Sequence, residues 1–163
     1  AFSCKRGVER FRRHNEINKR ICSTLSEAGS IAVLEPPSNS AIDSRRFDGI
    51  TVAAFERGRP MAWDATIVHT CAPSHLVASS AAPGAAAKQA EVLKTKKYAD
   101  TDTRIEFRPI GLESLGAFGP QALNLIFSLG ARVRSLTGEL GARQRIFRQI
   151  ATSIQAGNSR TII

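Results

Sequence analysis

Two aspartates, Asp48 and Asp64, interrupt two runs of strand-forming residues and are the first candidates for chemistry. The runs, near 49–55 and 61–68, flank a charged turn around Gly58, which predicts a β-hairpin. Asp is depleted in strands because its carboxylate competes with the ladder and is costly to bury. A three-residue loop with Gly58 in the left-handed conformation would place both carboxylates on one face, whereas an even loop would place them on opposite faces unless a bulge intervened. Two acids on one face predict a metal site, although either one alone is equally compatible with a strand end.

An amine is expected beside these acids. The run 61–68 is apolar at nearly every position, so both faces of that strand should be covered and Asp64 should need a partner, for which a divalent cation would serve. Lys97 continues the apolar stripe of a helix predicted over 84–98, so its amine either extends to solvent or reaches a carboxylate. Two carboxylates and a lysine are the parts of a metal-dependent phosphodiesterase site, in which the cation activates water and the amine neutralises charge.

The elements that must position these groups follow from periodicity and breakers. The expected order is a helix over 8–28, a strand over 30–35, the hairpin, an Ala/Ser/Pro-rich connection over 71–83, the helix 84–98, an edge strand over 104–110, and helices over 120–136 and 142–156. This order predicts an α/β fold with a mixed central sheet flanked by helices and a C-terminal helical pair. We expect a core that carries the candidate site over residues 1–110 and a helical extension packed on it over 111–163.

Composition narrows the class of partner. The chain has 163 residues and a formal net charge of +9, with a pI of about 10.3. This balance favours a polyanion, most simply nucleic acid, and no apolar run approaches the roughly 20 residues of a membrane span. The three cysteines are too scattered for a disulfide framework or a zinc set. The chain opens on Ala1 rather than Met, which predicts excision from a longer protein.

The first predicted helix combines an inward stripe with a basic surface. Its stripe is expected to contain Val8, Phe11, Ile17, Ile21 and Leu25. Cations crowd its first half, where the helix dipole disfavours them, and an anionic ligand would offset that cost, although such runs are usually solvated. His14 lies near the stripe, where a histidine is either a satisfied core residue or a catalyst.

The order and spacing of several short motifs resemble the restriction-like endonuclease domain of non-LTR retrotransposon polyproteins, a branch of the PD-(D/E)xK nuclease superfamily. The matching stretches are Phe11-Arg12-Arg13-His14-Asn15, Val33-Leu34-Glu35-Pro36-Pro37, Arg46-Phe47-Asp48-Gly49, Trp63-Asp64-Ala65-Thr66, Ala72-Pro73-Ser74-His75-Leu76, Lys96-Lys97-Tyr98, Arg145-Ile146-Phe147-Arg148-Gln149-Ile150 and Ile154-Gln155-Ala156-Gly157-Asn158. The resemblance covers nearly the whole chain and implies a restriction-endonuclease-like fold.

The resemblance assigns roles residue by residue. It implies that Asp48 and Asp64 bind Mg²⁺ or Mn²⁺, that Lys97 is the catalytic lysine, and that His14 belongs to an Arg-His-Asn motif near the active site. Thr66 stands where the wider superfamily has its lysine, so the helix must supply that charge. We assign nucleic-acid binding to exposed cations of the two basic helices, namely Arg10, Arg12, Arg13, Lys94 and Lys96.

Three positions qualify the resemblance. Phe47 replaces the family's proline before the first acid, and His69 stands where the family usually has an acid. Cys4 resembles the last ligand of a zinc knuckle whose other ligands lie upstream, so no zinc is expected in this fragment. Neither Phe47 nor His69 removes a metal ligand, but Phe47 is also compatible with a decaying genomic copy.

The implied function is Mg²⁺-dependent nicking of a double-stranded DNA target for retrotransposon integration. The alternatives are a catalytically degenerate DNA- or RNA-binding remnant and a structural helper that holds RNA or the rest of the polyprotein. The expected partners are target DNA, element RNA and an upstream reverse transcriptase domain, without a membrane, and the expected location is the nucleus.

Overall fold

A computed structural model describes residues 8–37, 46–100 and 102–162, with side chains to residue 160. The elements are α1 (Val8–Glu27), β1 (Ala32–Leu34), β2 (Gly49–Thr51), β3 (Met61–Val68), α2 (Pro73–Ala81), α3 (Ala85–Lys97), β4 (Glu106–Glu113), α4 (Pro120–Thr137) and α5 (Ala142–Ile162). The four strands form one sheet in the order β1-β2-β3-β4, antiparallel except for the parallel pair β3–β4. The predicted α/β class, mixed sheet and C-terminal helical pair are therefore confirmed.

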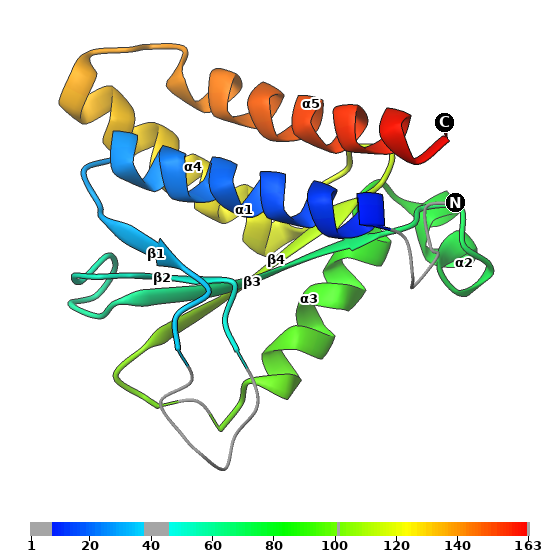
Figure 1. Cartoon of the computed structure of the whole chain (residues 1–163), viewed down its shortest axis with the longest axis horizontal. Coiled ribbons are helices and arrows are strands. Elements are labelled where there is room, and N and C mark those ends of the chain that lie inside the picture. Colours follow the sequence, from blue (N-terminus) through cyan, green and yellow to red (C-terminus); the bar gives the residue numbers. More distant parts are fainter. Residues whose placement is uncertain (1–7, 38–45, 101, 163) are drawn as a thin grey trace.

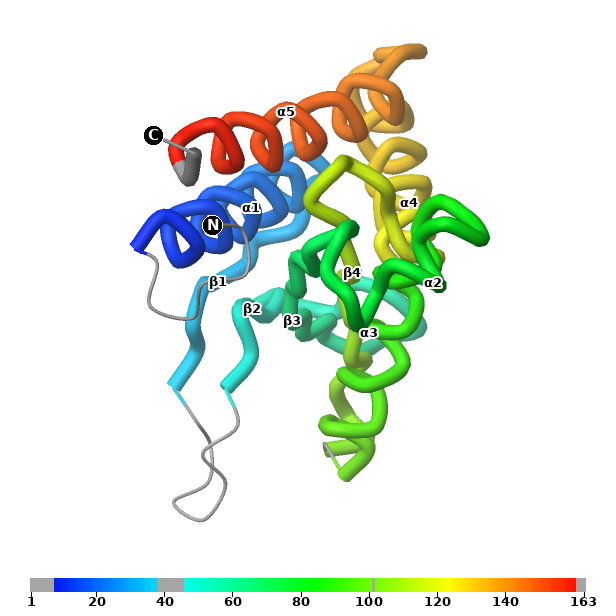
Figure 2. The backbone as a smooth tube through the Cα atoms, turned by 90° about the vertical axis from the view of Figure 1, so that its right-hand side faces the viewer, coloured from blue at the N-terminus to red at the C-terminus, as the bar shows by residue number. Residues whose placement is uncertain are grey.

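The sheet lies between two unequal helical layers (Figure 1). Helices α1 and α4 cover one face, α5 packs across them as an outer layer, and α3 covers the other face (Figures 1 and 2). Within the described part of the chain, no helix is long and apolar enough to span a bilayer. The predicted boundary at residues 110/111 falls inside β4, and one core contains residues from both of the predicted segments.

Strand β3 connects the two layers because its side chains alternate between them. Met61, Trp63 and Ala65 belong to the large core beneath α1, α4 and α5. Val68 packs instead with Ala86 and Ala90 of α3. Every residue from Met61 to Ala65 is buried, which confirms that both faces of this strand are covered.

The helix predictions are confirmed for α1, α3, α4 and α5, with ends displaced by one residue at most, except that α5 continues to Ile162 instead of ending at residue 156. Two further details were wrong. The expected inward residues Val8 and Phe11 are each more than 60% exposed. The connection predicted over 71–83 contains α2, which begins at a proline and buries none of its residues. Because α2 has no buried stripe, periodicity could not indicate it.

The predicted hairpin has a different turn. Arg57 and Gly58 both have positive φ and form a two-residue turn closed by the Glu56–Arg59 bridge, instead of the expected three-residue loop. Six positions separate Glu56 from Ile50, but only three separate Arg59 from Ala62, its ladder partner. The first strand therefore contains an irregular segment, and β2 ends at Thr51 rather than near residue 55. The difference between the two separations is odd, so it compensates for the even-length turn and leaves Asp48 opposite Asp64 in the ladder.

Two buried glutamates connect helix α3 to neighbouring elements by accepting hydrogen bonds from backbone amides. Glu113 of β4 accepts hydrogen bonds from the amides of Ala86 and Ala87 at the start of α3. Glu91 of α3 accepts from three further amides, those of Gly111, Gln121 and Ala122. Burial is the main cause of a raised Glu91 pKa. These bonds hold α3 against β4, and α3 carries the lysines of the candidate site.

Candidate active site at the edge of strand β3

The chain bends at Asp48, where β2 meets the middle of β3. The ladder pairs Gly49 with Trp63, so Asp48 and Asp64 occupy the next opposed positions. The Asp48 amide nevertheless donates to the Trp63 carbonyl, while the Asp48 carbonyl accepts from Glu35 on the other side. In a regular strand both groups of one residue face the same neighbour, so Asp48 lies in a bulge-like distortion. Bulges re-aim side chains, and this one turns Asp48 toward α1.

The Asp48 carboxylate caps the exposed edge of β3. Its Oδ2 accepts a hydrogen bond of 2.7 Å from the Ala65 amide, immediately after Asp64. His14 Nε2 lies 3.0 Å from the same oxygen and 3.1 Å from the Ala65 carbonyl oxygen. The structure thus brings the predicted residues Asp48 and His14 into direct contact at the edge that β2 leaves open.

A chain of hydrogen bonds sets the orientation of His14. The Trp63 indole only donates, and its Nε1 donates to Asn18 Oδ1 at 3.0 Å. The Asn18 amide nitrogen is therefore turned toward His14 Nδ1, at 3.3 Å. In neutral His14, Nδ1 therefore accepts a hydrogen bond from Asn18, and the proton is on Nε2, which donates to Asp48.

The two members of this pair shift each other's pKa. The hydrogen bond to Asp48 is the main cause of a raised His14 pKa, against an opposing effect of burial, and the Asp64 charge adds to the increase. Burial is the largest single influence on the Asp48 carboxyl and favours a higher pKa, but the hydrogen bond and charge of His14 together with the Ala65 amide outweigh it and lower the pKa of Asp48. Both aspartates therefore act electrostatically on the same imidazole.

Asp64 lies on the α3 side of β3 and is only 5% exposed. Lys94 Nζ lies 2.8 Å from each of its two carboxylate oxygens. Lys97 Nζ is 4.0 Å from Oδ2. The predicted need for a partner at Asp64 is confirmed in the form of two lysines, of which Lys94, expected to bind nucleic acid, makes the closer contact.

Tyr98 completes the surroundings of Asp64. Its hydroxyl lies 2.9 Å from Asp64 Oδ2 and 2.8 Å from the Arg46 carbonyl oxygen. The ring packs between Phe107, at 4.4 Å between centroids, and Phe47, at 5.2 Å. Phe47, the departure from the family's proline, thus anchors the segment that leads into Asp48.

The basic residues assigned to nucleic acid do not form one surface. Arg10, Arg12 and Lys96 are exposed, and Arg12 pairs with Glu9. Arg13 is 2% exposed, and its guanidinium donates to Asn158 of α5. Arg13 therefore joins α1 to α5 inside the protein, and burial is the main cause of its lowered pKa.

Two residues of the site were missed from the sequence. Asn18 and Trp63 hold the His14 ring, whereas Asn15, the asparagine of the resemblance, is exposed. Asn18 lies four positions after His14, on the same helix face, and this spacing was the available signal. Cys4 lies outside the described residues. His69, at the end of β3, is 3.2 Å from the Ser114 hydroxyl.

The donor set suits a hard cation more than zinc. In the ranges 8–37, 46–100 and 102–160, no group of three or more His, Cys, Asp or Glu side chains is placed to hold a metal. Mg²⁺ needs fewer protein ligands, since it is commonly bound by one or two carboxylates with water and substrate phosphate. Asp48 and Asp64, which lie next to Ala65 of β3, provide two carboxylates. In this structure the charge of Asp64 is compensated by Lys94.

Comparison with known proteins adds no family assignment: no family model and no curated protein matches the chain. What the site does must therefore be inferred from the geometry of Asp48, Asp64 and their neighbours.

Proposed function

We propose that the chain is a Mg²⁺-dependent DNA endonuclease, related to the restriction-like domain of non-LTR retrotransposon polyproteins. One observation carries this proposal. Asp48, just before β2, and Asp64 of β3 both lie next to Ala65, with a histidine beside Asp48 and two lysines beside Asp64. The net charge of +9 supports a polyanionic substrate.

The residues divide the work of phosphodiester hydrolysis. Mg²⁺ held by Asp48 and Asp64 would polarise the scissile phosphate and lower the pKa of a bound water. Lys97, half exposed beside Asp64, is placed to neutralise charge on the phosphate. Lys94 balances the Asp64 carboxylate before the substrate binds, and His14 holds Asp48 in position through its Nε2.

Plasmid nicking tests the proposal. Supercoiled DNA is incubated with wild type, Asp64→Asn and Asp102→Asn, with Mg²⁺ or with EDTA. Asp102 is the matched control because its carboxylate pairs with nearby Arg104 on the surface and with no other cation among the described residues. We expect nicking by wild type and Asp102→Asn and at least a 100-fold loss in Asp64→Asn, the scale on which catalytic groups act. Equal nicking by all three proteins would reject the proposal.

A second candidate, a catalytically degenerate nucleic-acid-binding remnant, is favoured by one observation. Lys94 contacts both oxygens of Asp64, which leaves that carboxylate fully engaged by a protein cation. If the chain is such a remnant, wild type, Asp64→Asn and Asp102→Asn all bind duplex DNA and none of them nicks it. Binding without nicking by wild type would select the remnant over the enzyme.

The partners follow from the same proposal. We infer a double-stranded DNA target, element RNA and an upstream reverse transcriptase domain, and nuclear action on chromosomal DNA. DNA binding that weakens as salt rises would support the first of these, because phosphate contacts release counterions.

A further inference from the structure

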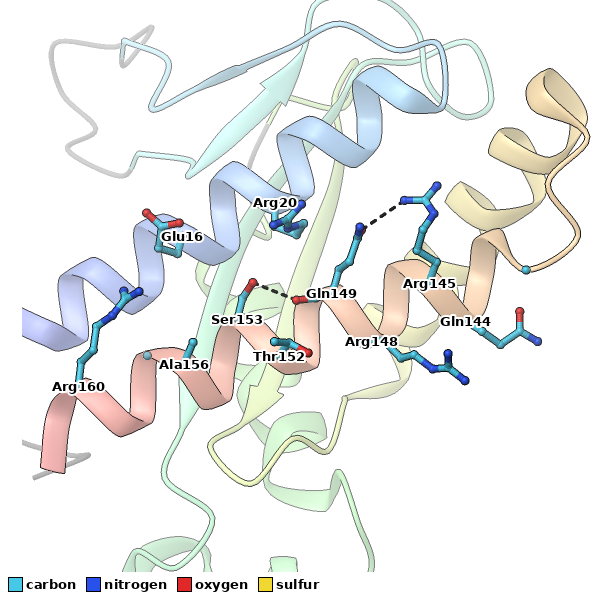
Figure 3. A pocket seen from close by; sticks show the side chains of 12 residues that line it. Glu16, Arg20, Gln144, Arg145, Arg148, Gln149, Thr152, Ser153, Ala156 and Arg160 are labelled. Atoms are coloured by element: carbon cyan, nitrogen blue, oxygen red, sulfur yellow. Dashed lines mark hydrogen bonds between the residues drawn. The ribbon is translucent and has the colours of Figure 1, made fainter.

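A basic groove runs along α5 on the side of α1 away from the candidate active site. It encloses about 620 Å³, and its lining includes four arginines, Arg20, Arg145, Arg148 and Arg160, with one carboxylate, Glu16 (Figure 3). Glu16 and Arg20 occupy the face of α1 opposite His14 and Asn18, which contact β3 and the edge of β2. The groove is therefore separated from Asp48 and Asp64 by the thickness of α1.

The arginines of this groove differ in how far they are neutralised. Arg145 contacts Glu27 at 2.9 Å and Glu139 at 2.8 Å, so its charge is already balanced. Arg20, Arg148 and Arg160 have no carboxylate within ion-pair distance in the part of the chain that the structure describes. Glu16 lies 3.4 Å from Lys19. The groove keeps an excess of positive charge suited to a polyanion.

An aromatic pocket adjoins the groove at its Gly141 end. This pocket, of about 450 Å³, is lined by Phe127, Phe147, Ile126 and Arg143, and it shares Gln144 and Arg148 with the basic groove. Phe127 is 47% and Phe147 is 37% exposed. The Arg143 guanidinium lies over the Phe127 ring at 5.0 Å. Flat aromatic and guanidinium surfaces of this kind stack on nucleobases.

We propose that the basic groove and the aromatic pocket together bind a single-stranded nucleic acid. The cations contact successive phosphates along α5, and an unpaired base enters the aromatic pocket beside Arg148. A duplex satisfies the cations but keeps its bases inside the helix, so it leaves the aromatic pocket unused. This surface goes beyond the proposed nuclease, and binding to it needs neither Mg²⁺ nor cleavage.

Fluorescence anisotropy in EDTA, on the Asp64→Asn background, tests the proposal independently of nicking. The probes are fluorescein-labelled oligouridylate and oligothymidylate, a duplex of the same length, and labelled polyglutamate. Arg148→Glu is compared with Lys88→Glu, an exposed cation of α3 outside both cavities. Phe127→Ala is compared with Leu93→Ala, an exposed apolar residue of α3.

We expect Arg148→Glu to weaken single-strand binding about 10-fold or more and to reduce the slope of log affinity against log salt by about 0.7 per lost phosphate contact. Phe127→Ala should weaken single-strand binding roughly 10-fold, the scale of one stacked base, without changing duplex binding. Arg148→Lys and Phe127→Tyr should retain most of the affinity, which separates lost contacts from lost folding. Circular dichroism verifies that each variant is folded.

Four results would overturn the proposal. They are equal losses in Arg148→Glu and Lys88→Glu, equal losses in Phe127→Ala and Leu93→Ala, a loss of duplex binding in Phe127→Ala as large as its loss of single-strand binding, and polyglutamate binding that falls with the same variants. The last result would identify the surface as a site for an acidic protein segment.

Discussion

The two sides of β3 hold their aspartates in different ways. On the α3 side, Asp64 is buried and contacts the amine of Lys94 at 2.8 Å, with Lys97 at 4.0 Å. On the α1 side, Asp48 is more exposed and is held by a backbone amide and an imidazole. One acid is balanced by permanent cations, whereas the other depends on hydrogen bonds and a titratable ring.

The two sides of β3 therefore differ in role: contacts on the α3 side balance a buried charge, and contacts on the α1 side orient a carboxylate. A buried carboxylate without a cation is strongly unfavourable, so the α3 side controls stability. The α1 side fixes direction, since Trp63, Asn18 and His14 form one oriented chain that ends on Asp48. Variants on the two sides should therefore respond to different conditions.

The largest effect is expected from removing the cation on the α3 side. Lys94→Met leaves Asp64 buried beside the Tyr98 hydroxyl and the more distant amine of Lys97, and we expect a loss of about 3 kcal/mol in the free energy of unfolding. Urea denaturation measures it, with the exposed Lys96→Met as matched control, expected within about 0.5 kcal/mol of wild type. The double variant Lys94→Met/Asp64→Asn should recover much of the loss. Similar stabilities of the two single lysine variants would remove the distinction between the two sides.

A smaller loss is expected on the α1 side. Asn18→Leu deprives the buried Trp63 indole of its acceptor and frees the His14 ring, and we expect a loss of about 2 kcal/mol. Asn15→Leu, on the exposed face of α1, is the matched control and should be nearly neutral. Because no permanent charge is involved, the loss should change little between low and high salt. A strong salt dependence would contradict an orienting role.

At the candidate site, a pH dependence is expected from the His14–Asp48 pair on the α1 side. His14 has a raised pKa, so its pairing stabilises the fold below pH 6.5 and is lost as the pH rises through its folded-state pKa. Asp48 has a lowered pKa, so its contribution is present above pH 3.8 and is lost as the pH falls through its folded-state pKa. Relative to wild type, His14→Gln should be least stable between these limits and should approach wild type at higher pH.

Unfolding of wild type and His14→Gln across this range measures that window, and imidazole NMR shifts give the pKa directly. His75→Gln, on α2, serves as the histidine control. A stability difference that does not vary with pH would show that the His14–Asp48 contact is not ionic.

The smallest effect is expected from Tyr98→Phe. The variant keeps the ring contacts with Phe47 and Phe107 and removes only the hydroxyl beside Asp64 and the Arg46 carbonyl. We expect a loss of about 1 kcal/mol in thermal or urea unfolding. A loss as large as that of Lys94→Met would assign the charge balance at Asp64 to the hydroxyl instead of the amine.

The elements that carry periodic burial could be predicted from the sequence. Helix α1 shows Ile17, Ile21 and Leu25 at helical spacing, and β3 shows an apolar run with Asp64 inside it. Helix α2 could not be predicted, because it buries nothing. The two-residue turn at Arg57-Gly58 and the irregular segment before it compensate each other, so Asp48 and Asp64 occupy opposed ladder positions. The expected single face for both carboxylates is not observed, because the distortion at Asp48 turns its carboxylate toward α1 whereas Asp64 contacts lysines of α3.

The candidate site was predictable in its residue types but not in its pairings. Asp64 required a cation, and helical spacing favoured Lys97, yet Lys94 makes the shorter contact because its flexible side chain reaches the carboxylate from a quarter turn away. Arg13 lies in a basic run but is directed inward by its hydrogen bond to Asn158, more than 100 residues later. Contacts of such separation are set by packing, which local patterns do not encode.

We propose that Asp48 and Asp64 together hold one divalent ion. Titration of the protein with Mn²⁺, followed by the EPR signal of the free ion, tests it most directly. We predict one site in wild type and in Asp102→Asn, weakened at least 10-fold by either Asp48→Asn or Asp64→Asn alone. Wild-type affinity in either of these two variants would show that the two carboxylates do not share an ion.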